Sequence, residues 1–137
     1  MGITHDNVRR MVDASNWDWN RAIFDHVHLR VADLERSRAF YTAALAPLDT
    51  PLLLDTPQLI QFGNLALSSD KSPSTGVHVA FTARSREEVH AFHDAAIAAG
   101  GVDNGAPAPR NYGPYTAYVL DPDGTNLEAA HRSRGNV

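Results

Sequence analysis

A chain of 137 residues with 43% hydrophobic and 20% charged residues is long enough for one domain with a buried core, and its composition is not that of a disordered protein. It has no cysteine, which excludes disulfides, thiolate metal ligands and cysteine nucleophiles, and its net charge of −4 argues against a nucleic-acid partner. It has no apolar run of the roughly 20 residues that a bilayer span needs and no apolar signal core at its start, so we expect a cytoplasmic protein without a membrane partner.

The first 22 residues stand outside the regular pattern of the remaining chain. They are predicted to form an N-terminal arm with a short helix, which Trp17 and Trp19 would pack against the domain. Residues 23–137 are predicted to form a single domain.

An internal repeat follows at an offset of 52 residues. The segment "HVHLRVADLERSRAFYTAAL" at 26–45 aligns without a gap with "HVAFTARSREEVHAFHDAAI" at 78–97, so that His26 matches His78. In both copies apolar residues first alternate with polar ones, which is the period of a strand, and then recur on one helical face. Each copy therefore predicts a strand followed by a helix.

Capping residues and turn residues mark the ends of these elements. Asp33 is expected to cap the first helix, and Ser85 with Glu88 forms a capping box before the second. Short strands are predicted at Leu52–Asp55, Leu59–Phe62, Leu65–Ser68, Tyr115–Leu120 and Asn126–Ala130, with a weaker one near Val102–Asp103. The Gly/Pro-rich stretch "GGVDNGAPAPRNYGPY" is expected to be a long loop, and "DPDG" at 121–124 a hairpin turn. The predicted fold is α+β: two tandem βαβββ modules, 23–70 and 76–131, that form a cupped mixed sheet.

The alternation within the strands places the histidines on the sheet face away from the helices. His26, His28 and His78 are expected there, together with Asn126 and Glu128 of the last strand. A pseudo-twofold relation between the modules would bring His26 and His78 to one concave surface, and two imidazoles with one carboxylate suit Fe, Mn, Ni or Zn. The alternative is that these histidines are hydrogen-bonded structural or surface residues, as we expect for the helical residues His90 and His93.

Two motifs carry a family resemblance. "FDHVHLRVADLERSRAFYTAALAPL" at 24–48 and "DPDGTNLEAA" at 121–130 resemble the opening strand and helix and the closing hairpin of the vicinal oxygen chelate superfamily. That superfamily includes glyoxalase I, extradiol dioxygenases, fosfomycin-resistance thioltransferases and bleomycin-resistance proteins. The resemblance covers about residues 23–131 and implies metal ligands at His26, His78 and Glu128. Glyoxalase I-like enzymes have a fourth acidic ligand, but Ala66 stands at the matching position, so a three-ligand site is implied.

The resemblance further implies a glyoxalase/dioxygenase-like metalloenzyme that acts on a small oxygen-rich substrate chelated to a divalent metal, in a homodimer. His28 and Asn126 are expected to orient substrate oxygens, while Arg110, Tyr112 and Tyr115 are expected to close over the substrate, with Arg110 favouring an anionic group. No general base is identified by spacing, so the catalytic residue stays unknown. A metal-free small-molecule binding or drug-sequestering protein of the bleomycin-resistance type is one alternative. A structural or regulatory module with a vestigial cavity is the other.

Overall fold

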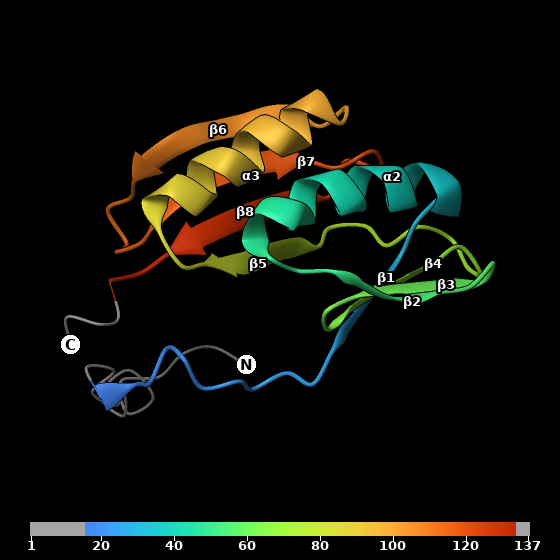
Figure 1. Cartoon of the computed structure of the whole chain (residues 1–137), viewed down its shortest axis with the longest axis horizontal. Coiled ribbons are helices and arrows are strands. Elements are labelled where there is room, and N and C mark those ends of the chain that lie inside the picture. Colours follow the sequence, from blue (N-terminus) through green and yellow to red (C-terminus); the bar gives the residue numbers. More distant parts are fainter. Residues whose placement is uncertain (1–15, 134–137) are drawn as a thin grey trace, which may run out of the picture.

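The computed structural model describes residues 16–133. Its elements follow the predicted βαβββ order twice (Figure 1). The first module contains β1 (Val27–Arg30), α2 (Leu34–Leu45), the 3-10 helix η2 (Ala46–Leu48), β2 (Leu52–Asp55), β3 (Leu59–Phe62) and β4 (Leu65–Ser68). The second contains β5 (His78–Ala83), α3 (Arg86–Ala98), β6 (Val102–Pro109), β7 (Tyr115–Leu120) and β8 (Asn126–His131). None of the helices within residues 16–133 is long and apolar enough to cross a membrane.

The strands form two mixed sheets with equivalent topology. The strand order is β1-β4-β3-β2 in the first sheet and β5-β8-β7-β6 in the second. In each, the opening strand pairs parallel with the last strand of its module and the other pairs are antiparallel. This equivalence confirms the repeat and the α+β fold with tandem modules.

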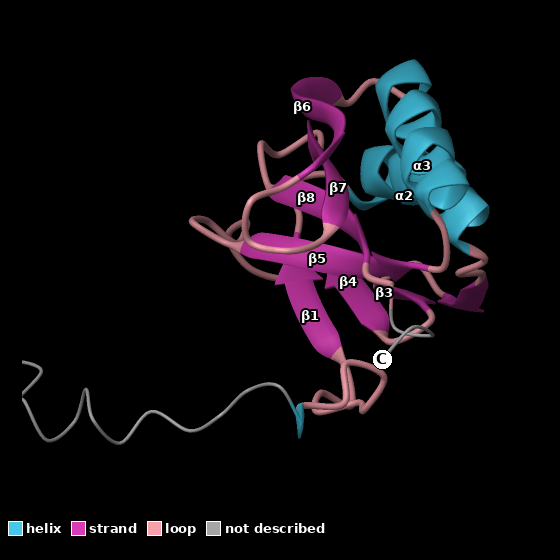
Figure 2. Cartoon of the chain, turned by 90° about the vertical axis from the view of Figure 1, so that its left-hand side faces the viewer, coloured by secondary structure: helices cyan, strands magenta, loops and turns pink. Residues whose placement is uncertain are grey.

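Both helices cover the same side of the sheets and pack against each other (Figure 2). Their apolar faces enter one continuous core, which includes Phe40 and Leu45 of α2 and Val89 and Phe92 of α3. Asp33 caps α2 as predicted, because its side chain accepts a hydrogen bond from the backbone N–H of Arg36. The core therefore fixes the helix side of each sheet and leaves the opposite face open.

The predicted capping box before α3 forms only in part. Ser85 accepts from the backbone N–H of Glu88 at 3.1 Å. The Glu88 carboxylate instead accepts from the backbone N–H of Arg84 at 2.9 Å and from the Arg84 guanidinium. Half of the expected reciprocal pattern is thus replaced by an ion pair.

The long loop predicted after α3 is mostly strand. β6 occupies half of that Gly/Pro-rich stretch and pairs antiparallel with β7, with register shifts on either side of Gly105. A Cβ at Gly105, where φ is +153°, would lie 2.8 Å from Cδ2 of Tyr118, so only glycine allows this close approach. The loop prediction was wrong because β6 is an edge strand, where proline and irregular register are tolerated.

Most of the predicted N-terminal helix lies outside the described residues. Residues 17–22 run in turns and irregular backbone. Trp17 and Trp19 remain 40% and 49% exposed, so they do not join the core, although the Arg132 guanidinium lies 3.7 Å from the centroid of the Trp19 ring. The segment therefore contacts Arg132, just after β8, rather than the hydrophobic interior.

The "DPDG" turn of the second module is anchored to the first module. The Tyr41 hydroxyl donates to Oδ2 of the buried Asp121 at 2.5 Å. Oδ1 of Asp123 accepts from the backbone N–H of Ala32 at 3.2 Å and from the Arg36 guanidinium at 3.4 Å. These contacts connect the start of α2 to the hairpin from which β8 begins.

The buried Tyr41 hydroxyl predicts a loss of stability at alkaline pH. Burial, followed by the Asp121 carboxylate, raises the pKa of Tyr41 well above its ordinary value of 10.0. Above the unfolded-state pKa the native state therefore binds more protons than the unfolded state, and the free energy of unfolding falls by up to ~1.4 kcal/mol per pH unit from this group. Denaturant unfolding from about pH 8 to about pH 11 is expected to show a shallower decline for Tyr41→Phe than for the wild type.

Tyr115→Phe is the control, because it removes a tyrosine of β7 and leaves Tyr41 in place. It is expected to keep the wild-type slope. Parallel declines of Tyr41→Phe and the wild type would show that Tyr41 does not titrate differently in the folded and unfolded states.

Candidate functional site

The open face of the second sheet holds a buried carboxylate. Glu128 lies opposite Ala80 of β5 and Tyr118 of β7, so these three residues form one row across the sheet. His78 is two residues before Ala80 on the same face of β5, and is therefore diagonal to Glu128. The Glu128 side chain is only 7% exposed, whereas that of His78 is 45% exposed. An acid at such a position needs partners for both of its oxygens.

Both carboxylate oxygens have such partners. Nε2 of His78 donates to Oε1 of Glu128 at 2.8 Å, and the Tyr112 hydroxyl donates to Oε2 at 3.1 Å. The Tyr118 hydroxyl contacts the Tyr112 hydroxyl, and the Tyr118 ring stacks on the His78 imidazole with centroids 6.0 Å apart. Burial, with the Tyr118 hydrogen bond second, raises the pKa of Tyr112 to about 12, so its hydroxyl stays a donor near neutral pH.

A cavity of ≈ 470 Å³ adjoins this cluster at the start of β5 and β8. Its lining consists of Ser74, Thr75, Gly76, Val77, His78, Asp123, Gly124, Thr125 and Asn126. Oδ1 of Asn126 accepts from the Asn104 amide at 3.1 Å, which leaves the Asn126 amide nitrogen as a donor. The predicted site residues His78 and Asn126 thus border one polar, half-open space.

Two residues expected to close over a substrate have other partners. Nε of Arg110 donates to Oγ1 of Thr116 at 2.9 Å, and its Nη2 donates to the Ala106 carbonyl at 2.7 Å. Tyr115 lies on the helix side of β7, where its hydroxyl hydrogen-bonds Nε2 of His90 at 2.6 Å. The structure therefore brings Tyr112 to the cluster, places Arg110 beside it, and leaves Tyr115 on the opposite face.

The remaining predicted residues belong to the first module. His26 lies just before β1 and is exposed, with Nδ1 at 2.8 Å from Oδ2 of Asp25. Nε2 of His28 donates to Oγ of Ser68 at 2.7 Å, and Ser68 donates to Asp70 at 2.6 Å. Burial, followed by the Arg30 charge, lowers the pKa of His28, which favours a neutral imidazole. The structure does not bring either histidine to His78.

The donor chemistry of His78 and Glu128 fits a divalent metal, but the described residues of one chain do not complete a set of three ligands. An imidazole nitrogen and a carboxylate oxygen held 2.8 Å apart are two suitable ligands. Within residues 16–133, no three His, Asp or Glu side chains form a group that could hold a metal ion. His90 and His93 pair separately with Tyr115 and Asp103. Residues 16–133 of one chain therefore bring together two of the three metal ligands that the sequence predicted.

Sequence reasoning missed Tyr118 and Ser68. Tyr118 is two residues from Thr116 on the open face of β7, so the period of two could have identified it once the face was known. Ser68 ends β4 opposite Arg30 of β1, and only the pairing of those strands reveals its contact with His28.

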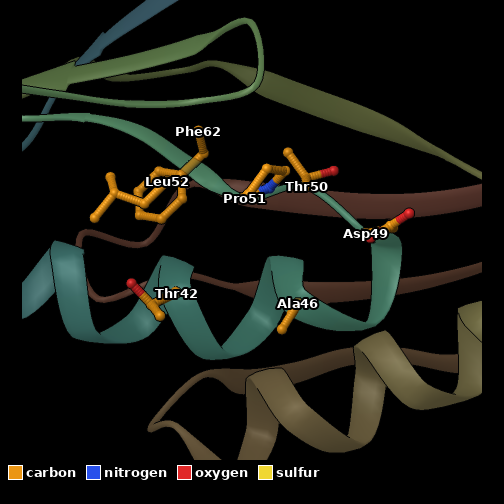
Figure 3. Close-up of a pocket in the computed structure, with 7 residues that line it drawn as sticks. All are labelled: Thr42, Ala46, Asp49, Thr50, Pro51, Leu52 and Phe62. Carbon is orange, nitrogen blue, oxygen red and sulfur yellow. The ribbon is translucent and has the colours of Figure 1, made fainter.

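A second cavity of ≈ 270 Å³ lies between the end of α2 and β2–β3 (Figure 3). It is lined by Thr42, Ala46, Asp49, Thr50, Pro51, Leu52 and Phe62. Asp49 is its only titratable residue and pairs with Arg84 at 3.6 Å. This cavity shares no lining residue with the cluster around Glu128.

The fold is that of a class of proteins built from tandem βαβββ modules, and comparison with known proteins agrees on this class. Residues 53–129 match the model of the Glyoxalase/Bleomycin resistance protein/Dioxygenase superfamily. The chain belongs to this superfamily. Among curated proteins none matches the sequence.

Solved structures support the same assignment. A glyoxalase/bleomycin resistance protein from Albidiferax ferrireducens T118 is 32% identical, with a TM-score of 0.73, and the match covers 81% of this chain and 99% of that chain. A glyoxalase-related enzyme from Fulvimarina pelagi is 24% identical, with a TM-score of 0.65 and coverage of 80% and 87%. A lactoylglutathione lyase from Agrobacterium tumefaciens is 22% identical, with a TM-score of 0.59 and coverage of 81% and 94%. The last two similarities show the fold alone.

Proposed function

We propose that the protein is a metal-dependent enzyme of the glyoxalase/dioxygenase type that acts on a small oxygen-rich substrate. The observation that carries the proposal is the pair formed by His78 and the buried Glu128 carboxylate, 2.8 Å apart on the open face of the second sheet. A carboxylate that is almost inaccessible to water is costly unless it is paired or binds a cation. The resident metal would be Fe, Mn, Ni or Zn, all of which accept this ligand type.

The third ligand is proposed to be His26 of a second copy of the chain, in a homodimer. His26 is exposed, and its only hydrogen-bond partner among residues 16–133 is the adjacent Asp25. β1 runs toward β5, so the residues at its beginning lie farther from β5 than those at its end (Figure 2). A symmetric dimer would bring β1 of each subunit to the second sheet of the other and create two equivalent sites.

Each residue around the proposed metal site has its own role. A bound metal supplies Lewis-acid polarisation to two neighbouring substrate oxygens. Tyr112 holds Oε2 of Glu128, so that the acid keeps one orientation. The Asn126 amide lines the cavity and donates to a substrate oxygen, and His28 would enter with His26 and contact the substrate from the opposite wall.

Metal content of protein purified without chelators or an affinity tag tests the proposal. About one transition metal per chain is expected in the wild type, and none in His78→Ala, Glu128→Ala or His26→Ala. His90→Ala is the control and is expected to keep its metal, because His90 is hydrogen-bonded to Tyr115 on the helix side. A wild type without metal after loading with Fe, Mn, Ni and Zn would contradict the proposal.

A metal-free small-molecule binding protein is the second candidate. The observation that favours it is that the metal donors of residues 16–133 do not form a complete set in one chain, while the ≈ 470 Å³ cavity already adjoins His78 and Asn126. In that case a ligand raises the melting temperature of metal-free protein, and Asn126→Leu abolishes the shift. Metal-dependent stabilisation alone would exclude this candidate.

A further inference from the structure

The turn between β6 and β7 carries Tyr112 to the buried carboxylate. The backbone N–H of Arg110 donates to the Pro114 carbonyl at 2.9 Å, and the backbone N–H of Gly113 donates to the Arg110 carbonyl at 3.1 Å. Gly113 has φ +125°, a conformation that side chains rarely adopt. The turn is therefore tight, and the direction of Tyr112 depends on how this turn is held above the sheet.

The Arg110 side chain holds the turn. Its Nε donates to Oγ1 of the fully buried Thr116 at 2.9 Å. Its Nη2 bridges the two strands, donating to the Ala106 carbonyl of β6 at 2.7 Å and to the Thr116 carbonyl of β7 at 3.0 Å. The guanidinium also lies over the Tyr118 ring, 5.2 Å from its centroid. A planar donor fork with several fixed acceptors has far less freedom than a surface arginine.

We infer that Arg110 is a positioning residue for Glu128, acting through Tyr112, rather than a binding group for an anionic substrate. Arg110 fixes the turn, the turn places the Tyr112 hydroxyl on Oε2 of Glu128, and this hydrogen bond fixes the carboxylate. The inference rests on the proposed function only in taking Glu128 as a metal ligand.

The hydrogen bond that fixes Oε2 also fixes the direction of Oε1, the other oxygen of Glu128. Oε1 is the oxygen that faces Nε2 of His78, and these two residues would hold the metal. Without Tyr112 the carboxylate can rotate, and Oε2 loses the hydrogen bond that balances its burial. Loss of such a supporting hydrogen bond typically weakens metal affinity about 10- to 100-fold.

The first experiment uses metal-free protein and follows the carboxyl carbon resonance of Glu128 by NMR. Tyr112→Phe removes the hydroxyl and is expected to displace this resonance, and Arg110→Met is expected to displace it in the same direction although it leaves the hydroxyl in place. Arg86→Met is the matched control: the Arg86 guanidinium lies over the Tyr115 ring of the same hairpin, 4.5 Å from its centroid, but on the helix side. It is expected to leave the resonance unchanged.

The second experiment titrates the same variants with Co²⁺. Tyr112→Phe and Arg110→Met are each expected to weaken Co²⁺ binding about 10- to 100-fold. The double variant is expected to bind Co²⁺ as tightly as Tyr112→Phe alone, because both changes remove the same hydrogen bond between Tyr112 and Glu128. Thr116→Val, which keeps the side-chain shape and removes the acceptor of Arg110 Nε, is expected to fall between Arg110→Met and the wild type. If Arg110→Met does not fold, the Co²⁺ affinity of Thr116→Val tests the positioning role of Arg110.

The inference is overturned if Arg110→Met leaves both the Glu128 resonance and the Co²⁺ affinity at wild-type values, or if the double variant loses affinity additively. A wild type that binds no Co²⁺, combined with a common displacement in Tyr112→Phe and Arg110→Met, supports the positioning role and contradicts the proposed metal function. Failure of the positioning role and failure of the proposed metal function therefore give different results.

Discussion

Mixing His26→Ala subunits with Glu128→Ala subunits is expected to restore metal binding that neither variant has alone. In the proposed dimer each site takes His26 from one chain and His78 with Glu128 from the other. The mixed dimer therefore contains one site with all three ligands and one site that lacks two of them. With random pairing, about half of the dimers are mixed, so the sample regains about a quarter of the wild-type metal per chain.

A second mixture serves as the control. His78→Ala and Glu128→Ala remove ligands that lie on the same chain, 2.8 Å apart in the hydrogen-bonded pair. Every site in their mixed dimer then lacks one ligand, and no metal is expected to return. Metal analysis and Co²⁺ absorption after co-refolding measure both mixtures.

The outcome distinguishes the two possible locations of the site. If the three ligands came from one chain, each subunit of the first mixture would lack a ligand of its own and neither mixture would recover. Recovery in both mixtures would show that a mixed dimer binds metal at a site that lacks one of the three ligands, and would contradict the ligand assignment. Recovery in the first mixture alone would support His26 as the ligand from the second copy.

Local sequence patterns predicted most of the fold because short-range physics determines those elements. The predicted strand Asn126–Ala130 is one residue shorter than β8, and Asp33 and Ser85 cap the helices as their side chains suggest. Only the start of β6, near Val102–Asp103, was predicted, because glycine and proline are normally depleted in strands. An edge strand with shifted register accommodates them, and the pairing that stabilises β6 is made with β7, which composition does not reveal.

The sequence predicted the placement of the candidate site residues correctly only where they lie together in one sheet. His78 and Glu128 lie on neighbouring strands of the second sheet, and the repeat together with the period of two placed them on one face. His26 was expected beside them on the assumption that the modules meet through their first strands. The modules of one chain instead meet through α2, α3 and the Asp121 turn, because burial of the helices stabilises that contact, and β1 and β5 share no hydrogen-bonded ladder. The His26 assignment stays a prediction.

Asp121→Ala is expected to destabilise the protein by about 3–5 kcal/mol, because the side chain accepts three hydrogen bonds at a buried position. Asp121 is 4% exposed; its Oδ2 accepts from Tyr41, and its Oδ1 accepts from the backbone N–H groups of Asp123 at 2.9 Å and Thr125 at 2.8 Å. Alanine leaves the buried Tyr41 hydroxyl and two part-buried backbone N–H groups without this partner, so the cost exceeds that of the hydrogen bonds alone. Urea unfolding measures the difference, with the exposed Asp94→Ala expected to change stability by less than about 0.5 kcal/mol.

The same variant also tests how the first module supports the site in the second. Since Asp121 orders the turn that leads into Asn126 and Glu128, its loss is expected to weaken Co²⁺ binding as well as stability. Tyr41→Phe removes one of the three hydrogen bonds and should cost about 1–2 kcal/mol, and the double variant should lose less than the sum, because Tyr41 and Asp121 interact directly. Additive losses, or an Asp121→Ala variant within about 1 kcal/mol of the wild type, would show that this buried contact does not couple the two modules.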